Sequence, residues 1–176
     1  MRRVRYVVAM SLDGYIAGPN GEADWIIMDP DIDFGALFEQ FDTFLLGRRT
    51  FEGMAGTGGG SQSGIQTIVF SRTLRQEDYP NVSIVSENPE HALTDLRSKP
   101  GKDIWLFGGG SLFRSLLEAQ LVDAIEVSVI PVLLGEGIPL LPPNPSSERF
   151  ALKLTSCRTY KTGIVSLEYA VEYEPA

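Results

Sequence analysis

Short runs of apolar, often β-branched residues alternate with helical patterns over most of this chain. Strands are expected at residues 4–10, 43–47, 66–70, 82–85, 103–107, 124–130, 150–160 and 164–173. Helices are expected at residues 31–41, 48–54, 89–98 and 110–119. Such alternation requires crossover connections and hence a mostly parallel sheet, whereas the last two strands, joined around Thr162 and Gly163, predict an antiparallel hairpin. The sequence therefore predicts a three-layer α/β fold with a mixed, mostly parallel sheet of about eight strands, helices on both faces and a C-terminal hairpin.

The length of 176 residues predicts one domain over residues 1–176. Two segments have loop composition: residues 55–64 are rich in glycine and residues 139–148 in proline. Neither separates regions large enough to fold alone, so both are expected to be loops on the same body.

Composition and charge exclude several classes of function. The net charge of −8 argues against a nucleic-acid partner, which normally meets a basic face. No apolar run approaches the roughly 18 residues of a membrane span, and the basic start of the chain leads directly into Asp13, which favours a first strand over a signal peptide. The single cysteine, Cys157, fits a reducing, cytoplasmic location. With one histidine, His91, and no cysteine cluster, neither a metal site nor a Ser-His-Asp triad is expected.

A run of three glycines follows an apolar strand in the segment IWLFGGGSLF, residues 104–113. Glycines at such a junction let backbone N–H groups approach a phosphate at the positive end of the next helix. The dinucleotide fingerprint G-x-G-x-x-G is not met, because Phe113 stands at its third glycine, and no Walker A loop is present. The run predicts a nucleotide-binding turn, with a tight turn at a helix start as the alternative.

Basic residues follow two further predicted strands. In LLGRRTFEGM the strand ends at Gly47 and is followed by Arg48, Arg49 and Thr50, and TIVF is followed by Ser71 and Arg72. Open α/β sheets bind ligands beyond the carboxyl ends of their strands, and the planar guanidinium of arginine suits phosphate. The sequence therefore predicts an anion pocket, the alternative being that Arg48 and Arg49 are solvated or paired with Glu52 or Asp42.

A long glycine-containing loop follows the first predicted strand, in AMSLDGYIAGPNGEADW, residues 9–25. Asp13-Gly14 and Asn20-Gly21 supply turn positions. Tyr15, Ile16 and Trp25 are apolar for a surface loop, and loops of this length are usually lids or binding loops. We expect these side chains to cover a planar ring.

Five segments together resemble the dihydrofolate reductase-like superfamily, especially the branch that includes the reductase domain of the riboflavin-pathway bifunctional deaminase-reductase. They are VVAMSLDGYIA (7–17), ADW (23–25), FLLGRRTFE (44–52), IVFSR (68–72) and WLFGGGSLF (105–113). Their order and spacing are more specific than any one of them, and the terminal hairpin also fits the eight-stranded sheet typical of that superfamily.

The resemblance implies an NADPH-dependent reductase that transfers a hydride to a C=N or C=O of a pyrimidine- or pterin-type heterocycle, and a homodimer. It implies that Gly47, Arg48, Arg49 and Thr50 hold the pyrophosphate and that Ser71 and Arg72 read the ribose 2′-phosphate. The other implied cofactor residues are Ala9, Ile16, Phe107, Gly109, Gly110, Ser111, Leu112 and Phe113. The implied substrate residues are Ser11, Asp13 and Trp25.

The acid for this reaction is sought among the aspartates of MDPDIDFGALF, residues 28–38. Folate-reducing relatives use one carboxylate near the start of the first helix, which here favours Asp31 over Asp33. The alternative is that these acidic residues cap the helix and complement its dipole.

Two departures from the relatives bear on the substrate. Folate reductases place an arginine just before the third strand to bind the glutamate tail, and Ile65 stands there in this chain. The riboflavin-pathway enzyme carries a zinc-dependent deaminase domain that this sequence lacks. The sequence therefore favours a stand-alone reductase most like 5-amino-6-(5-phosphoribosylamino)uracil reductase, with dihydrofolate reductase activity or a non-catalytic nucleotide-binding module as alternatives.

Overall fold

The computed structural model of this chain describes residues 1–55, 64–144 and 149–173. Its main feature is an eight-stranded sheet in the order β5-β4-β3-β6-β1-β7-β10-β9. The strands are β1 (Val4–Ser11), β3 (Phe41–Gly47), β4 (Gln66–Phe70), β5 (Ser83–Val85), β6 (Asp103–Gly108), β7 (Ala124–Ile130), β9 (Ala151–Thr159) and β10 (Val165–Glu172). The first six strands pair in parallel, and β10 pairs antiparallel with β7 and β9. The expected mixed sheet and C-terminal hairpin are confirmed.

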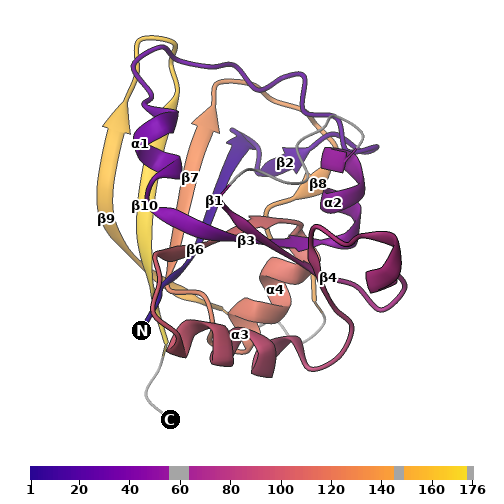
Figure 1. Ribbon diagram of the computed structural model, residues 1–176. Helices are drawn as coiled ribbons and strands as arrows, with labels where there is room; N and C mark the ends of the chain where they lie inside the picture. Colours follow the sequence, from indigo (N-terminus) through magenta and orange to yellow (C-terminus); the bar gives the residue numbers. More distant parts are fainter. Residues whose placement is uncertain (56–63, 145–148, 174–176) are drawn as a thin grey trace.

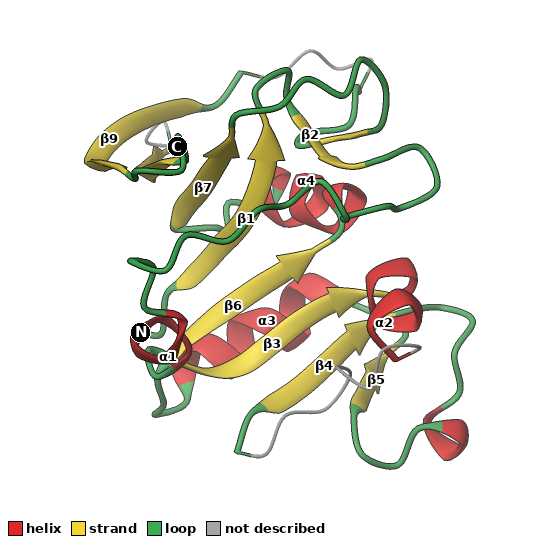
Figure 2. Cartoon of the chain, turned by 90° about the horizontal axis from the view of Figure 1, so that it is seen from above, coloured by secondary structure: helices red, strands yellow, loops and turns green. Residues whose placement is uncertain are grey.

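Helices cover both faces of the sheet (Figures 1 and 2). They are α1 (Phe34–Phe38), α2 (Arg48–Ala55), α3 (Pro89–Ser98) and α4 (Gly110–Glu118). The apolar residues of α3 and α4 belong to one core cluster, and those of α1 and α2 to a second cluster around Phe44 and Trp105. The three-layer architecture predicted from the sequence is confirmed.

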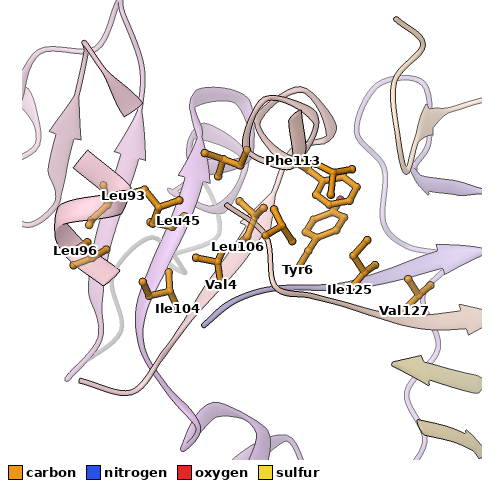
Figure 3. Packing of buried hydrophobic residues seen from close by; sticks show 14 residues of the cluster. Val4, Tyr6, Leu45, Leu93, Leu96, Ile104, Leu106, Phe113, Ile125 and Val127 are labelled. Carbon is orange, nitrogen blue, oxygen red and sulfur yellow. The ribbon is translucent and has the colours of Figure 1, made fainter. Parts of the chain in front are cut away.

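The larger core cluster forms because alternate residues of each strand point to the same face. Val4 and Tyr6 of β1 lie beside Ile104 and Leu106 of β6, and all four are essentially inaccessible to solvent (Figure 3). The helices close this face with their own apolar residues, including Phe113, whose ring stacks on Tyr6 with 4.0 Å between centroids. The helix after the glycine run is therefore anchored in the core.

The hydroxyl of Tyr6 has no hydrogen-bond partner within the described residues, and burial raises the pKa of this phenol. A buried hydroxyl without a partner costs about 1–3 kcal/mol. We therefore expect Tyr6→Phe to raise the free energy of unfolding by about 1 kcal/mol in urea denaturation followed by circular dichroism. The matched control is Tyr173→Phe, because the hydroxyl of Tyr173 donates to the Val122 carbonyl over 2.7 Å. The free energy of unfolding of Tyr173→Phe should fall by about 1 kcal/mol. An equal fall in both variants would contradict the prediction.

The helix expected at residues 31–41 is shorter than predicted. Residues 29–32 form a turn in which Ile32 N–H donates to the Asp29 carbonyl, and α1 begins only after Asp33, whose side chain accepts from Ala36 N–H over 2.9 Å. Pro30 lacks an N–H and Gly35 has low helix propensity, so the acidic pattern alone did not extend the helix. Asp31 therefore lies in a loop and not at a helix start.

Three short elements were not predicted. Strands β2 (Tyr15–Ala17) and β8 (Ile138–Pro139) pair with each other outside the main sheet, and a 3-10 turn covers Gln76–Asp78. Pairing of such short, distant strands leaves no periodic signal in the sequence. Of the two expected loops, the one at 55–64 falls mostly outside the described residues. The one at 139–148 begins in β8, and its residues 145–148 are not described.

Candidate functional site

The predicted cofactor turns meet at one edge of the sheet because their strands are parallel neighbours. Leu46 of β3 is in register with Gly108 of β6, and Gly47 is in register with Phe70 of β4. The residues that follow each strand therefore start at the same level of the carboxyl edge. Arg48, Ser71 and the glycine run belong to this edge, although they are far apart in the sequence.

The two glycine turns lie against each other. A Cβ on Gly47 would stand 3.6 Å from the Gly109 nitrogen, and a Cβ on Gly108 or on Gly109 would stand 3.4 Å from Thr50 Oγ1. Gly108 also has φ of +152°, which favours glycine, and its peptide bond to Gly109 is cis. The two turns and the Thr50 hydroxyl are thus within ordinary contact distance, and at Gly108 the backbone conformation itself favours glycine.

The α4 helix begins at this point with its N–H groups open. Gly109 is its N-cap and makes no side-chain capping bond, so the first N–H groups, on Gly110, Ser111 and Leu112, have no partner from a capping side chain. The next one, on Phe113, donates to the Gly109 carbonyl over 3.0 Å. A helix start of this kind, lined by glycine and next to Thr50, fits a phosphate group.

Gly110 meets a different constraint. A Cβ there would lie 2.9 Å from Pro142 Cγ and Cδ and 3.1 Å from the Pro139 carbonyl oxygen. The third glycine of the run thus admits the proline-rich segment against α4, which is a packing role that the motif does not reveal.

The predicted arginines follow the carboxyl ends of β3 and β4. Arg48, Arg49 and Arg72 are all exposed. Arg48 pairs with Glu52 at 3.5 Å, as the alternative interpretation expected, but both side chains are nearly half exposed and such pairs are weak. Asp42, the other expected partner, is bound by Arg2. The charges of the three arginines remain accessible to an anion.

Ser71 and Phe113 are occupied by the protein itself. Ser71 is buried, and its hydroxyl accepts the N–H groups of Thr73 and Leu74, which shapes the turn that presents Arg72. Phe113 is only 1% exposed and stacks on Tyr6. The Phe113 side chain is therefore part of the core, and its assignment to the cofactor holds at most for the turn that precedes it.

Strands β1 and β6 separate toward this same edge. Their pairing covers only Val4 to Tyr6 opposite Ile104 to Leu106, although both strands continue beyond it, and the divergence is visible in Figure 2. In the sheet, β3 lies on one side of β1 and β7 lies on the other, so the strand order reverses beside β1. Open α/β sheets usually bind their ligand at such a point. Ala9 and Phe107, both predicted cofactor residues, are half-buried on the diverging strand ends.

The turn after β1 is fixed by Asp13. Ser11 Oγ donates to Asp13 over 2.7 Å and accepts the Tyr15 N–H, and Asp13 also accepts N–H groups from Leu134 and Gly135. These bonds, led by the one from Ser11, lower the pKa of Asp13 to about 2. Ser11 is fully buried, so the observed role of this pair is to join two loops, and its proposed contact with substrate stays a prediction.

The loop with Trp25 runs along the carboxyl edge from β2 to α1 (Figures 1 and 2). Trp25 is half-buried, and its indole N–H donates to the Glu22 carbonyl over 3.0 Å. Ile16 lies at half-burial in β2 at the start of this loop. The predicted ring-covering residues are thus held in the segment that crosses the edge where β1 and β6 diverge.

Asp29 anchors the end of this loop and was not singled out from the sequence. Its carboxylate, 3% exposed, accepts the Asp31 N–H and both the N–H and the hydroxyl of Thr162 in the β9–β10 turn. The Asp31 N–H bond is the leading cause of its lowered pKa. Asp29 therefore fixes the backbone at Asp31, the candidate acid, whose side chain is exposed. Asp33 is also exposed and caps α1, as the alternative interpretation expected.

Two exposed leucines at this edge also escaped the sequence analysis. Leu12 is 65% exposed and Leu133 is 69% exposed, and Leu12 N–H donates to the carbonyl of Val132, the residue before Leu133. Two exposed leucines on adjacent loops at the carboxyl edge offer apolar surface to a ligand. Single apolar residues in loops carry no periodic signal, so only the structure brings them together.

The described residues contain no group of three or more histidine, cysteine, aspartate or glutamate side chains placed to hold a metal ion. None of the helices in the described part of the chain is long and apolar enough to cross a membrane.

Comparison with known proteins shows the family and the fold of this chain. Residues 2–166 match the family described as RibD C-terminal domain. The chain is 38% identical to the uncharacterized protein YyaP of Bacillus subtilis, covering 96% of this chain and 94% of that one. Among solved structures it resembles a putative riboflavin biosynthesis protein from Shewanella sp. PV-4, with a TM-score of 0.82, 24% identity and coverage of 98% and 100%. It also resembles a dihydrofolate reductase from Enterococcus faecalis complexed with NADP(H), with a TM-score of 0.66, 22% identity and 97% of each chain covered. The chain belongs to the RibD C-terminal domain family, and its fold is that of dihydrofolate reductase.

Proposed function

We propose that this protein is an NADPH-dependent reductase that transfers a hydride to a C=N or C=O of a pyrimidine- or pterin-type heterocycle. The reaction is most like that of 5-amino-6-(5-phosphoribosylamino)uracil reductase in riboflavin biosynthesis. The observation that carries the proposal is that the two glycine turns lie against each other at the carboxyl edge of the sheet, where Arg48, Arg49 and Arg72 are exposed after the ends of β3 and β4.

The residues present fit the phosphate groups of a dinucleotide. Thr50, Gly109 and the open start of α4 would hold the pyrophosphate together with Arg48 and Arg49, and Arg72 would bind the ribose 2′-phosphate. The dihydrofolate reductase of similar fold was solved with NADP(H), which supports the same choice of cofactor. When bound, NADPH supplies the hydride.

The protein itself would orient the reacting groups, exclude water from them and donate a proton. Ala9, Phe107 and Ile16 provide an apolar wall on the diverging strands and the loop strand. The loop carrying Trp25 crosses this edge and would limit the access of water to the reacting atoms. Asp31, held by its backbone to Asp29, is the proposed proton donor.

Reduction of dihydrofolate is the second candidate function. The residue before β4, Ile65, argues against it. Ile65 is half-buried there and packs against the cluster around Phe44 and Trp105. Because Ile65 is apolar and packs against this cluster, it cannot form an ion pair with the glutamate tail of a folate. A nucleotide-binding module without catalysis is the remaining alternative.

The testing experiment follows NADPH oxidation with a panel of dihydrofolate, a dihydropterin and the ribosylaminopyrimidine phosphate. We expect turnover of the pyrimidine or the pterin with NADPH and much less with NADH. Tight NADPH binding without turnover of any of the three would favour the non-catalytic module. Equal and weak binding of NADPH and NADH would remove the 2′-phosphate assignment to Arg72.

The proposal includes two further features carried by the resemblance: the protein acts in the cytoplasm and forms a homodimer. Neither alters the assignment of the site residues.

A further inference from the structure

Two serine hydroxyls meet on the sheet between neighbouring strands β7 and β10. Ser128 and Ser166 are in register across these strands, both side chains are half-buried, and their Oγ atoms are 3.3 Å apart. In the part of the chain that the structure describes, this contact is the one hydrogen bond that either hydroxyl makes. The pair therefore has hydrogen-bonding capacity that the protein itself does not use.

Strand alternation assigns the pair to the face of the sheet that carries α1. Successive side chains of a strand point to opposite faces. Val127 and Val129, on either side of Ser128, pack in or against the larger core cluster, which lies on the α4 face. Leu167, next to Ser166, lines an apolar pocket together with residues of α4. Both serines therefore point away from α4.

The smaller core cluster covers only part of this face. It joins α1 and α2 to β3 and β6 and reaches Val7 of β1. Among the described residues it includes none from β7 or β10. The serine pair therefore lies beside this cluster and not beneath it.

The register of the sheet relates the pair to the proposed position of the nicotinamide. Ser128 is in register with Ala9, the proposed nicotinamide contact, and Ala9 shares the face of Val7, two residues earlier. Neighbouring strands are about 4.8 Å apart, so Ser128 and Ser166 lie one and two such steps from Ala9. The glycine turn after β6 lies on the other side of β1. A substrate ring beside the nicotinamide, on the side away from the glycine turns, therefore lies over the two serines.

The groups around the pair leave it as a neutral polar contact. In the preceding row, Glu126 accepts two hydrogen bonds from the Arg5 guanidinium, so its charge is compensated. In the following row, Ile130 is apolar and 2% exposed. The charged residues further out, Glu168 and Arg158, are exposed. Uncharged hydroxyls in such a position suit the polar edge of an uncharged ring.

We propose that Ser128 and Ser166 bind the lactam edge of the substrate ring, a C=O with an adjacent N–H, and thereby select rings that have this edge. The inference rests on the proposed function, which places the ring beside Ala9. Two hydroxyls that share one hydrogen bond retain one O–H donor and free acceptor lone pairs between them. A donor next to an acceptor complements the lactam edge, which uracil-type pyrimidines and pterins share.

A ring without the lactam edge leaves the hydroxyls without partners. Sites built to hydrogen-bond a ligand discriminate strongly against analogues that lack the matching groups. A cross-strand serine pair could also serve the sheet alone, because such pairs stabilise neighbouring strands. A structural role changes stability, whereas a role in recognition changes the preference between two ligands, so the preference is the quantity to measure.

The first test measures dissociation constants by isothermal titration calorimetry in excess NADP⁺, with two pairs of probes. Pterin is compared with 2-aminopteridine, and 5,6-diaminouracil with 4,5-diaminopyrimidine; the second member of each pair lacks the lactam edge. In at least one pair, we expect the wild type to bind the lactam about 10-fold tighter or more. The double variant Ser128→Ala, Ser166→Ala should bind both members of that pair about equally.

The matched control is Ser156→Ala. Ser156 lies on β9 opposite Glu168, on the same face of the sheet, and it is exposed. Its removal deletes a hydroxyl outside the proposed contact, so the wild-type preference should remain. A wild type that shows no preference for the lactam in either pair would overturn the proposal. An unchanged preference in the double variant would also overturn it.

The second test uses steady-state kinetics with the best substrate of the heterocycle panel. Each single variant, Ser128→Ala or Ser166→Ala, should raise KM about 3- to 10-fold and leave the dissociation constant for NADPH unchanged. An active wild type whose KM is the same in both variants would overturn the assignment of the serines and leave the reductase in place. A preference for the lactam that depends on the serines, without turnover of any substrate, would support the ring site and remove the reductase.

Discussion

Arg72→Ala is expected to lower the affinity for NADPH by about 10- to 100-fold and to leave the affinity for NADH unchanged. Charge-assisted hydrogen bonds to a phosphate contribute about 1.5–3 kcal/mol, and each 1.4 kcal/mol is tenfold in affinity. Arg72 is exposed and follows the Ser71 turn at the carboxyl end of β4. Because only NADPH carries the 2′-phosphate, the ratio of the two affinities measures this contact alone. Isothermal titration calorimetry with both cofactors gives that ratio.

The control for this variant is Arg75→Ala. Arg75 is also exposed and lies three residues further along the same loop. Its removal changes the net charge by the same amount, so it corrects for the general attraction between an anion and the protein. If both variants weaken NADPH equally, the effect is one of net charge and the 2′-phosphate assignment to Arg72 is lost.

The sheet and most helices could be predicted because local patterns and packing agree. Strands β4 and β7 and helix α3 have the predicted bounds, since buried β-branched runs and an amphipathic turn pattern mark them clearly. The short α1 and the β2–β8 pair were missed for opposite reasons. The turn at Asp29 and capping by Asp33 delay the start of a helix that the acidic pattern suggested to begin at residue 31. A contact between residues far apart in the chain created the β2 and β8 strands, which no local pattern showed.

The candidate site was predictable in its backbone and less so in its side chains. Gly47 and Gly108 end two apolar strands, which the local sequence alone indicates. Because the two strands are parallel neighbours, their carboxyl ends lie side by side. The environment of a side chain depends on distant residues. Phe113 turns into the core against Tyr6, and Asp29 binds Thr162 from the last hairpin, which the spacing of residues within one motif does not reveal.

Ser11 is a second case in which the sequence did not reveal the contacts of a side chain. Ser11 is predicted to contact the substrate, and in the structure its hydroxyl donates to Asp13 and accepts from Tyr15 N–H. Serine two residues before aspartate forms a local turn that needs no ligand. The SLDGY segment therefore has a structural role that can exist with or without a contact to substrate.

Asp31→Asn is expected to lower kcat by about 100-fold or more while the dissociation constant for NADPH stays within a factor of two to three. General acid catalysis contributes about 10²–10⁴ in rate, and asparagine cannot donate a carboxylic proton. The side chain of Asp31 is exposed, so its replacement should leave the unfolding transition unchanged. Stopped-flow NADPH oxidation with the best substrate of the panel measures the rate, and fluorescence titration measures cofactor binding.

Asp33→Asn is the matched control, because it removes a carboxylate two residues away. Asp33 accepts the Ala36 N–H at the start of α1, and asparagine is an equally good N-cap, so α1 is preserved. We expect its kcat to stay near that of the wild type. A large fall of kcat in Asp33→Asn, with no fall in Asp31→Asn, would identify Asp33 as the proton donor instead. Full activity in both variants would show that the proton comes from the substrate or from water, and that the Asp29 anchor serves the shape of the loop alone.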